Sequence, residues 1–173
     1  MNYEDLELQF ENRLSFMRSA GVTVSVMPEL ESERSRPLPS KAGVTIIYAG
    51  SEYGLPNSTN QVRQEEKIFI QIYIESTFLR GPQGIYNLLS AVKDSIIGFA
   101  PPFCTRFQVV KHHTIGGDDA MKKDNMWCYS VIFQSTGIAV ENFIEDTSVI
   151  LKKITLIDVP GGEVTVIPNP NND

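Results

Sequence analysis

The residues best suited to chemistry are His112 and His113, the only histidines in the chain. Adjacent residues of a strand point to opposite faces of a sheet, so this pair cannot bind one metal ion together. Cys104 and Cys128 could join one of the histidines, but their spacing lacks the paired CxxC or HxxxH pattern of a zinc site. The sequence therefore predicts no metal site, and it predicts that both cysteines are buried, reduced thiols.

Other candidate groups have plainer explanations. Ser130 and Ser135 lie on a predicted strand, not on the sharp turn that carries a hydrolase nucleophile. The turn at residues 81–84, Gly-Pro-Gln-Gly, lacks the Lys and Ser/Thr of a P-loop, and Pro82 suits the start of a helix. Residues 116–119, Gly-Gly-Asp-Asp, resemble the metal-binding turn of viral RNA-dependent polymerases, but the strand before them offers no further carboxylates. We therefore predict no catalytic residue and no cofactor, and hence no enzyme.

Length and charge narrow the class of protein. A chain of 173 residues with 42% hydrophobic content can bury one core, so one domain is expected. The net charge of −6 argues against a nucleic-acid-binding surface, which is normally basic. The chain has no apolar run near the roughly 20 residues of a membrane span, and its acidic start does not resemble a signal peptide. These features predict a cytoplasmic protein that binds neither membrane nor specific DNA.

The clearest structural signal is a strand followed by a helix. Ile68, Ile70, Ile72 and Ile74 alternate with more polar residues, which predicts a strand at 67–75 buried on one face. Helical spacing of apolar residues predicts a helix at 83–98 that ends near a glycine. The remaining expected elements are a helix at 3–19 and strands at 22–26, 44–48, 105–115 and 125–136, the last two joined by a loop at 116–124.

This order of elements predicts an α+β fold, in which two helices pack on one face of a mainly antiparallel (mixed) sheet. The helix at 3–19 should begin after Asn2 and end at Gly21. Polar connections are expected at 29–41 and 50–60, and the second is long enough to suggest a role. We assign residues 1–138 to this domain. Residues 139–173 are expected to form a C-terminal β extension, with strands near 149–159 and 164–167, and a frayed tail belonging to the same domain.

The order and spacing of certain residues resemble a known family. The strand ending in Tyr48-Ala49-Gly50-Ser51 is followed by Gln61 and Arg63, then by the isoleucine-rich strand and Arg80. The helix that ends at Gly98 opens with the sequence Gly-Ile-Tyr-Asn-Leu-Leu at 84–89. Over residues 3–137 this pattern is similar to the Mu-like tail terminator family of tailed bacteriophages, the Gp37-type proteins, which are related in fold to the tail terminator of phage lambda.

The resemblance implies a structural virion protein. Such a protein would form a ring, by analogy a hexamer, on the last ring of the tail tube, and would stop polymerisation of tube and sheath. Its expected partners are itself, the tail tube, possibly the sheath, and a neck or head-completion protein, while DNA only passes through. It would be located at the neck end of the virion tail and in the host cytoplasm during assembly. The alternatives are a small cytoplasmic ligand-binding or regulatory domain, or another tail or neck connector subunit.

A ring needs two different patches on each subunit, and the sequence offers candidates for both. Tyr53 and Leu55 lie in the long polar segment and would gain by burial against a partner. Arg63 and Arg80 flank the central strand, and acidic residues line one side of the first helix. We predict that these arginines face that acidic side across the interface, although intramolecular pairing or solvation is the simpler alternative. The acidic residues are Glu4, Asp5, Glu7 and Glu11.

Overall fold

The computed structural model describes residues 2–28, 42–56, 63–115 and 126–140. The chain divides into two compact units, Met1–Glu141 and Asn142–Asp173, and all the described residues belong to the first. The expected connection at 29–41, the loop at 116–124 and the C-terminal strands lie outside the described residues. The division of the chain at residue 138 therefore stays a prediction.

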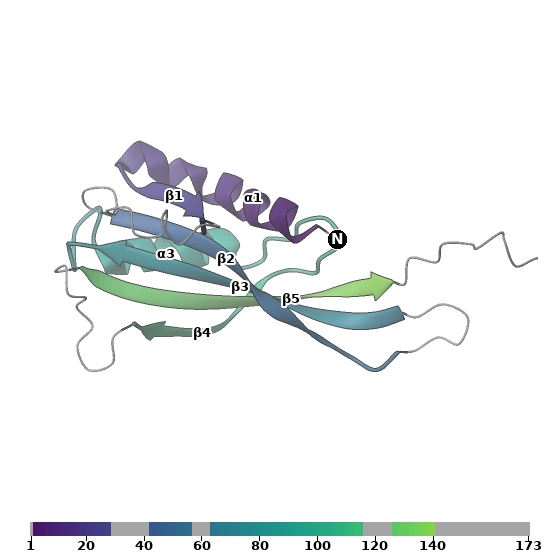
Figure 1. Ribbon diagram of the computed structural model, residues 1–173. Coiled ribbons are helices and arrows are strands. Elements are labelled where there is room, and N and C mark those ends of the chain that lie inside the picture. The colour runs from purple at the N-terminus through teal and green to yellow at the C-terminus, as the bar shows by residue number, and fades with distance from the viewer. Residues whose placement is uncertain (1, 29–41, 57–62, 116–125, 141–173) are drawn as a thin grey trace, which may run out of the picture. The chain divides into compact units, whose positions relative to one another are not determined.

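The described part is an α+β unit built on a mixed five-stranded sheet with the order β1-β2-β3-β5-β4 (Figure 1). Only the β1–β2 pair is parallel, and the other three pairs are antiparallel. This confirms the predicted α+β class with a mixed, mainly antiparallel sheet, and the antiparallel pairing of the last two strands. The strands are β1 (Thr23–Val26), β2 (Ala42–Tyr53), β3 (Arg63–Ser76), β4 (Gln108–Thr114) and β5 (Trp127–Val140), and the α-helices are α1 (Tyr3–Leu14) and α3 (Ile85–Ile96).

The core forms around the central strand β3. Its isoleucines at 68, 70, 72 and 74 are all fully buried, as their alternation predicted. They share one cluster with Phe10 and other buried residues of α1, and with Val92 and other buried residues of α3. The rings of Phe10 and Phe107 meet edge to face, with their centroids 4.9 Å apart. Burying large aromatic and branched side chains between helix and sheet supplies most of the free energy that stabilises such a unit.

The N-terminal helical segment as a whole begins and ends where the sequence predicts. The Asn2 side chain accepts a hydrogen bond from the backbone N–H of Glu4, which caps the helix. The α-helix ends at Leu14, and the chain continues as a 3₁₀ helix over Ser15–Ala20. Gly21 then adopts the left-handed conformation, with φ of 77°, that stops it. The prediction of one regular α-helix over 3–19 was therefore wrong from Ser15 onward, where the chain forms the more tightly wound 3₁₀ helix.

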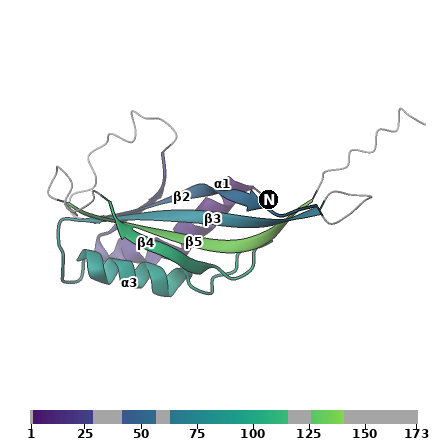
Figure 2. The same cartoon turned by 90° about the horizontal axis from the view of Figure 1, so that it is seen from below.

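Strands β2, β3 and β5 are longer than the sequence suggests. The connection expected at 50–60 was wrong in its first part, because β2 continues through Tyr53. A bulge lies between Tyr48 and Gly50, where the pairing with β3 shifts by one residue. Because the bulge interrupts the period-two alternation of side chains, the sequence pattern does not show that β2 continues beyond it. Figure 2 shows the three long strands continuing well past the end of α3.

Helix α3 starts later than predicted. Gly84 is its N-cap, so Pro82 lies in the turn before the helix and not at its first position. Gly84 is required by space, because a Cβ atom there would collide with the Arg80 backbone. The helix ends at Ile96, two residues before Gly98, which has a positive φ of 81°. The prediction that this segment forms a helix with apolar residues at helical spacing is nevertheless confirmed.

Candidate functional site

A buried carboxylate organises the end of the sheet that lies beyond the apolar core. Glu66, on β3, is only 2% exposed although it is charged. Its Oε1 atom accepts hydrogen bonds from the hydroxyls of Tyr3 at 2.6 Å, Ser51 at 2.6 Å and Tyr53 at 3.3 Å. Burying a carboxylate is costly unless it accepts hydrogen bonds, and these three hydroxyl donors lower the cost at Glu66.

Tyrosine rings surround this carboxylate and connect it to helix α1. The ring of Tyr3 stacks on that of Tyr48 with 4.1 Å between centroids, and the Tyr48 hydroxyl lies 2.7 Å from the Ser51 hydroxyl. The hydrogen bond to Glu66, followed by that involving Tyr53 and by burial, raises the pKa of Tyr3 above its usual value. The Tyr3 phenol is therefore a proton donor at neutral pH, and the cluster fastens the first residues of α1 to β2 and β3.

The bulge in β2 makes this cluster possible. The pairing places Tyr48 opposite Ile70, Ser51 opposite Ile68 and Tyr53 opposite Glu66. Residues directly opposite in a sheet share a face, so all three β2 side chains point to the same face as the core isoleucines. Without the extra residue at the bulge, Ser51 and Tyr53 would point to the other face.

The same end of the sheet carries exposed apolar side chains. We use the name sheet end for Ser51–Tyr53 of β2, Arg63–Lys67 of β3 and Thr136–Val140 of β5, which are paired with one another. Ile138 and Val140 are 69% and 50% exposed, Tyr53 is 53% exposed, and Leu55, just after β2, is 90% exposed. Several exposed apolar side chains close together on a sheet mark a surface that could bind a partner.

The predicted interface residues fall into separate places. Arg63 begins β3 at the sheet end, near Tyr53 and Leu55, whereas Arg80 lies beyond the opposite end of β3, in the turn before α3. Glu4 is exposed on the first turn of α1. Of the predicted set, Tyr53, Leu55 and Arg63 therefore lie at the same end of the sheet, and Arg80 lies at the other end.

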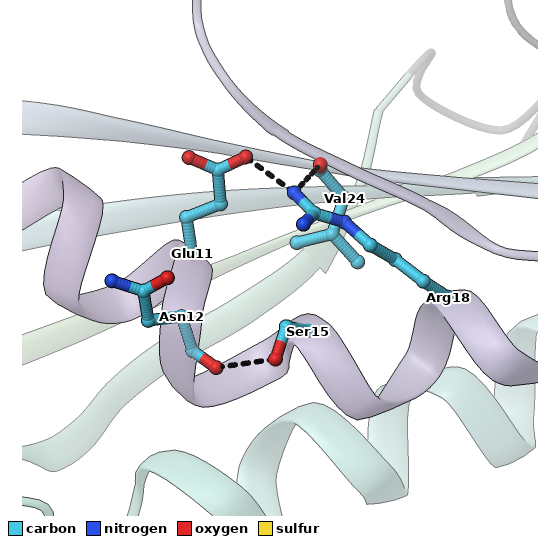
Figure 3. A network of polar contacts seen from close by, with 5 residues as sticks. All are labelled: Glu11, Asn12, Ser15, Arg18 and Val24. Carbon is cyan, nitrogen blue, oxygen red and sulfur yellow. Dashed lines mark hydrogen bonds and ion pairs between the residues drawn. The ribbon is translucent and has the colours of Figure 1, made fainter.

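Two of the acidic residues of α1 have partners within the chain. The Glu7 carboxylate accepts a hydrogen bond from the backbone N–H of Tyr48, at the bulge, with an N···O distance of 2.6 Å. Glu11 forms an ion pair with Arg18 at 2.5 Å, and the same Arg18 nitrogen donates to the carbonyl of Val24 in β1 at 2.9 Å (Figure 3). These contacts close the outer edges of β2 and β1, since each pairs a backbone group that faces away from the sheet.

The edge on the other side of the sheet is closed in part. The backbone N–H of Thr105 donates to the carbonyl of Thr136, and the N–H of Thr136 donates to the Thr105 hydroxyl, at 2.8 and 3.0 Å. Strand β4, which pairs with β5 before this point, has a register shift between Val109 and Lys111. A bulge and charged side chains are common devices that protect an edge strand from further pairing.

The groups considered for chemistry are not brought together in the described part of the chain. His112 and His113 are both exposed on the edge strand β4. Cys128 is fully buried and its thiol donates to Glu75 Oε1 at 3.3 Å, while Cys104 is half-buried and burial raises the pKa of its thiol. The prediction of a buried Cys104 was therefore only partly right. The Gly-Gly-Asp-Asp segment at 116–119 lies outside the described residues.

A hollow beside the sheet end is smaller than most ligand sites. It measures about 240 Å³ and is lined by Glu52, Tyr53, Gly54, Glu65 and Lys67. Small-molecule sites usually enclose roughly 300–1,000 Å³ with mostly apolar walls. This hollow is better explained as a gap between neighbouring surface side chains of β2 and β3 than as a binding pocket.

Sequence reasoning missed Tyr3, Tyr48 and Glu66. One signal could have found the carboxylate, because Glu66 has the same parity as the four core isoleucines of β3. A charged residue at a buried position of a strand needs partners, and tyrosine and serine hydroxyls are suitable donors. The partners themselves come from α1 and from beyond a bulge, which strand periodicity cannot reveal.

The fold and this site define an α+β scaffold protein whose distinctive features are a hydrogen-bonded carboxylate cluster and an apolar sheet end. A family model described as Gp37 protein matches residues 12–157, and the chain belongs to that family. The match extends past Gly137, where the resemblance recognised in the sequence ends. No curated protein matches the chain in sequence.

Solved structures with a similar backbone include one from a virion. It is a chain from the virion of a native gene transfer agent particle, with 11% identity and a TM-score of 0.45. The similarity covers 75% of this chain and 92% of that chain. At this identity and score, it carries no conclusion about function. No helix in the described part of the chain is both long and apolar enough to cross a membrane.

Proposed function

We propose that this protein is a structural component of a phage or phage-like virion, and specifically a tail terminator. It forms a ring, by analogy a hexamer, that caps the tail tube and sheath and joins them to the neck or head-completion protein. Both helices pack on one face of the sheet, as in the tail terminators that the sequence resembles. The chain performs no catalysis in this role, and DNA passes through the ring without specific contacts.

Membership of the Gp37 family carries this proposal, because the match covers most of the chain. The surface of the described part is compatible with assembly. Tyr53, Leu55, Ile138 and Val140 expose apolar area at one end of the sheet, where a neighbouring subunit could bury it. The negative net charge suits a protein that lets DNA pass without binding it.

The proposed interface combines apolar side chains with a neighbouring arginine. Tyr53 and Leu55 supply apolar contact area, and Arg63 begins β3 beside them. Arg80 and Glu4 lie elsewhere on the unit and are available to a different neighbour. Exposed ion pairs contribute only about 0–1 kcal/mol each, so apolar burial must supply most of the affinity. Glu7 and Glu11 act within the subunit, where they orient α1 against the sheet.

The test is native mass measurement of the full chain, followed by electron microscopy of the protein mixed with purified tail tubes. We expect a closed oligomer whose mass is six times that of one chain, or single rings at tube ends. Leu55→Asp should weaken assembly at least tenfold while circular dichroism stays unchanged, and the matched control Ser90→Asp, an exposed change on α3, should assemble normally. A chain that is monomeric at high concentration and never binds tube ends would refute the proposal.

A further inference from the structure

Among the described residues, the sheet end has two edges without a strand partner, and the direction of its backbone groups can be derived from the hydrogen bonds. On β5, Thr136 directs its N–H and C=O away from β3, toward Thr105. Backbone groups alternate in direction along a strand, so Ile138 and Val140 also direct theirs outward. Within the described part of the chain, no hydrogen bond reaches these outward groups.

The opposite edge of the sheet end is open in the same way. The N–H of Gly54 donates to the carbonyl of Glu65 at 2.8 Å, so Gly54 directs its groups toward β3. By alternation, Tyr53 and Ser51 direct theirs outward. Their side chains donate to Glu66. Within the described residues, no hydrogen bond reaches the outward backbone groups of Ser51 and Tyr53.

The other strand edges of the described sheet differ from these two, because a hydrogen bond from another segment or a bulge protects each of them. Arg18 closes β1 at Val24, Glu7 closes β2 at Tyr48, and Thr105 closes β5 at Thr136. Strand β4 has its bulge and its exposed charged and histidine side chains. On β5, by contrast, residues 137–140 read Gly-Ile-Ala-Val, with no charge to oppose pairing. An apolar edge with unpaired backbone groups favours the addition of another strand.

We propose that the β5 edge of one copy pairs with the β2 edge of the next copy, so that the sheet continues across the subunit boundary. The inference rests on the proposed function, since it names the contact that joins neighbours in the ring. Because each copy has one edge of each kind, the contact is heterologous and can repeat around a closed ring.

The faces of the two edges determine the orientation of this pair. Ile138 lies opposite Glu65 and Glu52 lies opposite Lys67, so both side chains point away from the core face. Ser51 and Tyr53 point to the core face. In a parallel ladder, an outward-directed residue bonds to the residues before and after the one that it faces. Pairing Ile138 with Glu52 of the next copy meets this condition and keeps the core faces of the two copies on the same side, and this is the register that we propose.

This register specifies the hydrogen bonds. The N–H of Ile138 donates to the carbonyl of Ser51 in the next copy, and the carbonyl of Ile138 accepts from the N–H of Tyr53 in that copy. The N–H of Val140 donates to the carbonyl of the same Tyr53. Strands β2 and β5 are both antiparallel to β3 and hence run in the same direction. A ring axis that runs roughly along the strands keeps this direction from copy to copy, so the two edges meet in the parallel orientation.

Disulfide cross-linking tests the pair directly. Full-length chains that carry Glu52→Cys or Ile138→Cys, both with Cys104→Ser, are mixed under conditions where native mass spectrometry shows the ring, on tail tubes if rings form only there. We expect covalent dimers in the mixture at least tenfold above the level in either variant alone. A control mixture of Glu52→Cys with Lys111→Cys, on the protected β4 edge, should not cross-link.

A second pair of variants distinguishes the contribution of the Ile138 backbone N–H from that of its side chain. Ile138→Pro removes an outward N–H without removing a hydrogen bond inside the subunit, and it should weaken assembly at least tenfold. Ile138→Thr keeps that N–H and should assemble almost normally. Two results would overturn the edge pairing and leave the proposed function standing. One is an intact ring that cross-links only in the control mixture with Lys111→Cys, and the other is an intact ring formed by Ile138→Pro. The absence of any ring, alone or on tubes, would overturn both.

Discussion

Glu66 accepts a 2.6 Å hydrogen bond from the phenol of Tyr3, a residue 63 positions earlier in the chain. This contact joins the first turn of α1 to the central strand β3 at the point where the apolar core ends. Because Ser51 and Tyr53 share the same acceptor atom, one carboxylate holds the start of the helix and the end of β2 together. These hydrogen bonds anchor the side chains of the open β2 edge within the subunit.

Removing the carboxylate should destabilise the fold. Glu66→Ala leaves the hydroxyls of Tyr3, Ser51 and Tyr53 without their acceptor, and we expect the free energy of unfolding to fall by roughly 2–3 kcal/mol. The control Glu65→Ala changes an exposed carboxylate on the neighbouring position and should stay within about 0.5 kcal/mol. Urea denaturation followed by circular dichroism measures both. Equal stability of the two variants would show that the cluster contributes nothing.

The Tyr3 phenol should make stability fall at alkaline pH. Its pKa is raised in the folded state from the ordinary value of 10.0, so the folded protein holds this proton more tightly than the unfolded chain. The contribution is fully present below pH 10 and is lost as the pH rises above 10 toward the folded pKa. The stability difference between wild type and Tyr3→Phe should be constant from pH 7 to about 9 and shrink above 10. Unfolding midpoints at each pH give this difference, and a constant difference throughout would contradict the assignment.

The turn before β4 should be stabilised by a glycine. The N–H of Cys104 donates to the carbonyl of Pro101, which makes Phe103 the third residue of a turn, and Phe103 has a positive φ of 69°. With proline second, this is a type II turn, which favours glycine at that position. Phe103 is 81% exposed, so Phe103→Ala removes the ring with little loss of packing. Phe103→Gly should be about 1 kcal/mol more stable than Phe103→Ala in thermal unfolding, and the reverse order would show that the backbone is not strained there.

The hydrogen bond from Tyr48 to Glu7 should be measurable by substitution. Glu7→Ala leaves the backbone N–H at the bulge without its 2.6 Å acceptor, and a loss of about 1–2 kcal/mol is expected. Glu4→Ala, on the exposed side of the same helix turn, is the matched control and should change stability by about 0.5 kcal/mol or less. Amide hydrogen exchange at Tyr48 should also accelerate in Glu7→Ala alone. Unchanged exchange in that variant would mean that water replaces the carboxylate without cost.

Local patterns in the sequence were sufficient for most of the framework. The alternation of isoleucines from 68 to 74 determined both the central strand and its buried face, because strand periodicity is a property of neighbouring residues. Asn2 and Gly21 marked the limits of the first helical segment for the same reason, since caps act within one turn. The α+β class of the described part, a mixed sheet with helices α1 and α3, followed from the order of these elements.

The tertiary structure alone decided the features on which the proposed assembly depends. The bulge after Tyr48 moves Ser51 and Tyr53 to the core face, and no local pattern marks it, because a bulge is defined by the partner strand. Glu66 is satisfied by Tyr3, which only the packing of α1 on the sheet brings near. Which edges are open is likewise a non-local property. Arg18, Glu7 and Thr105 close three of them from other segments of the chain, and their absence beyond Thr136 leaves Ile138 and Val140 open in the described structure.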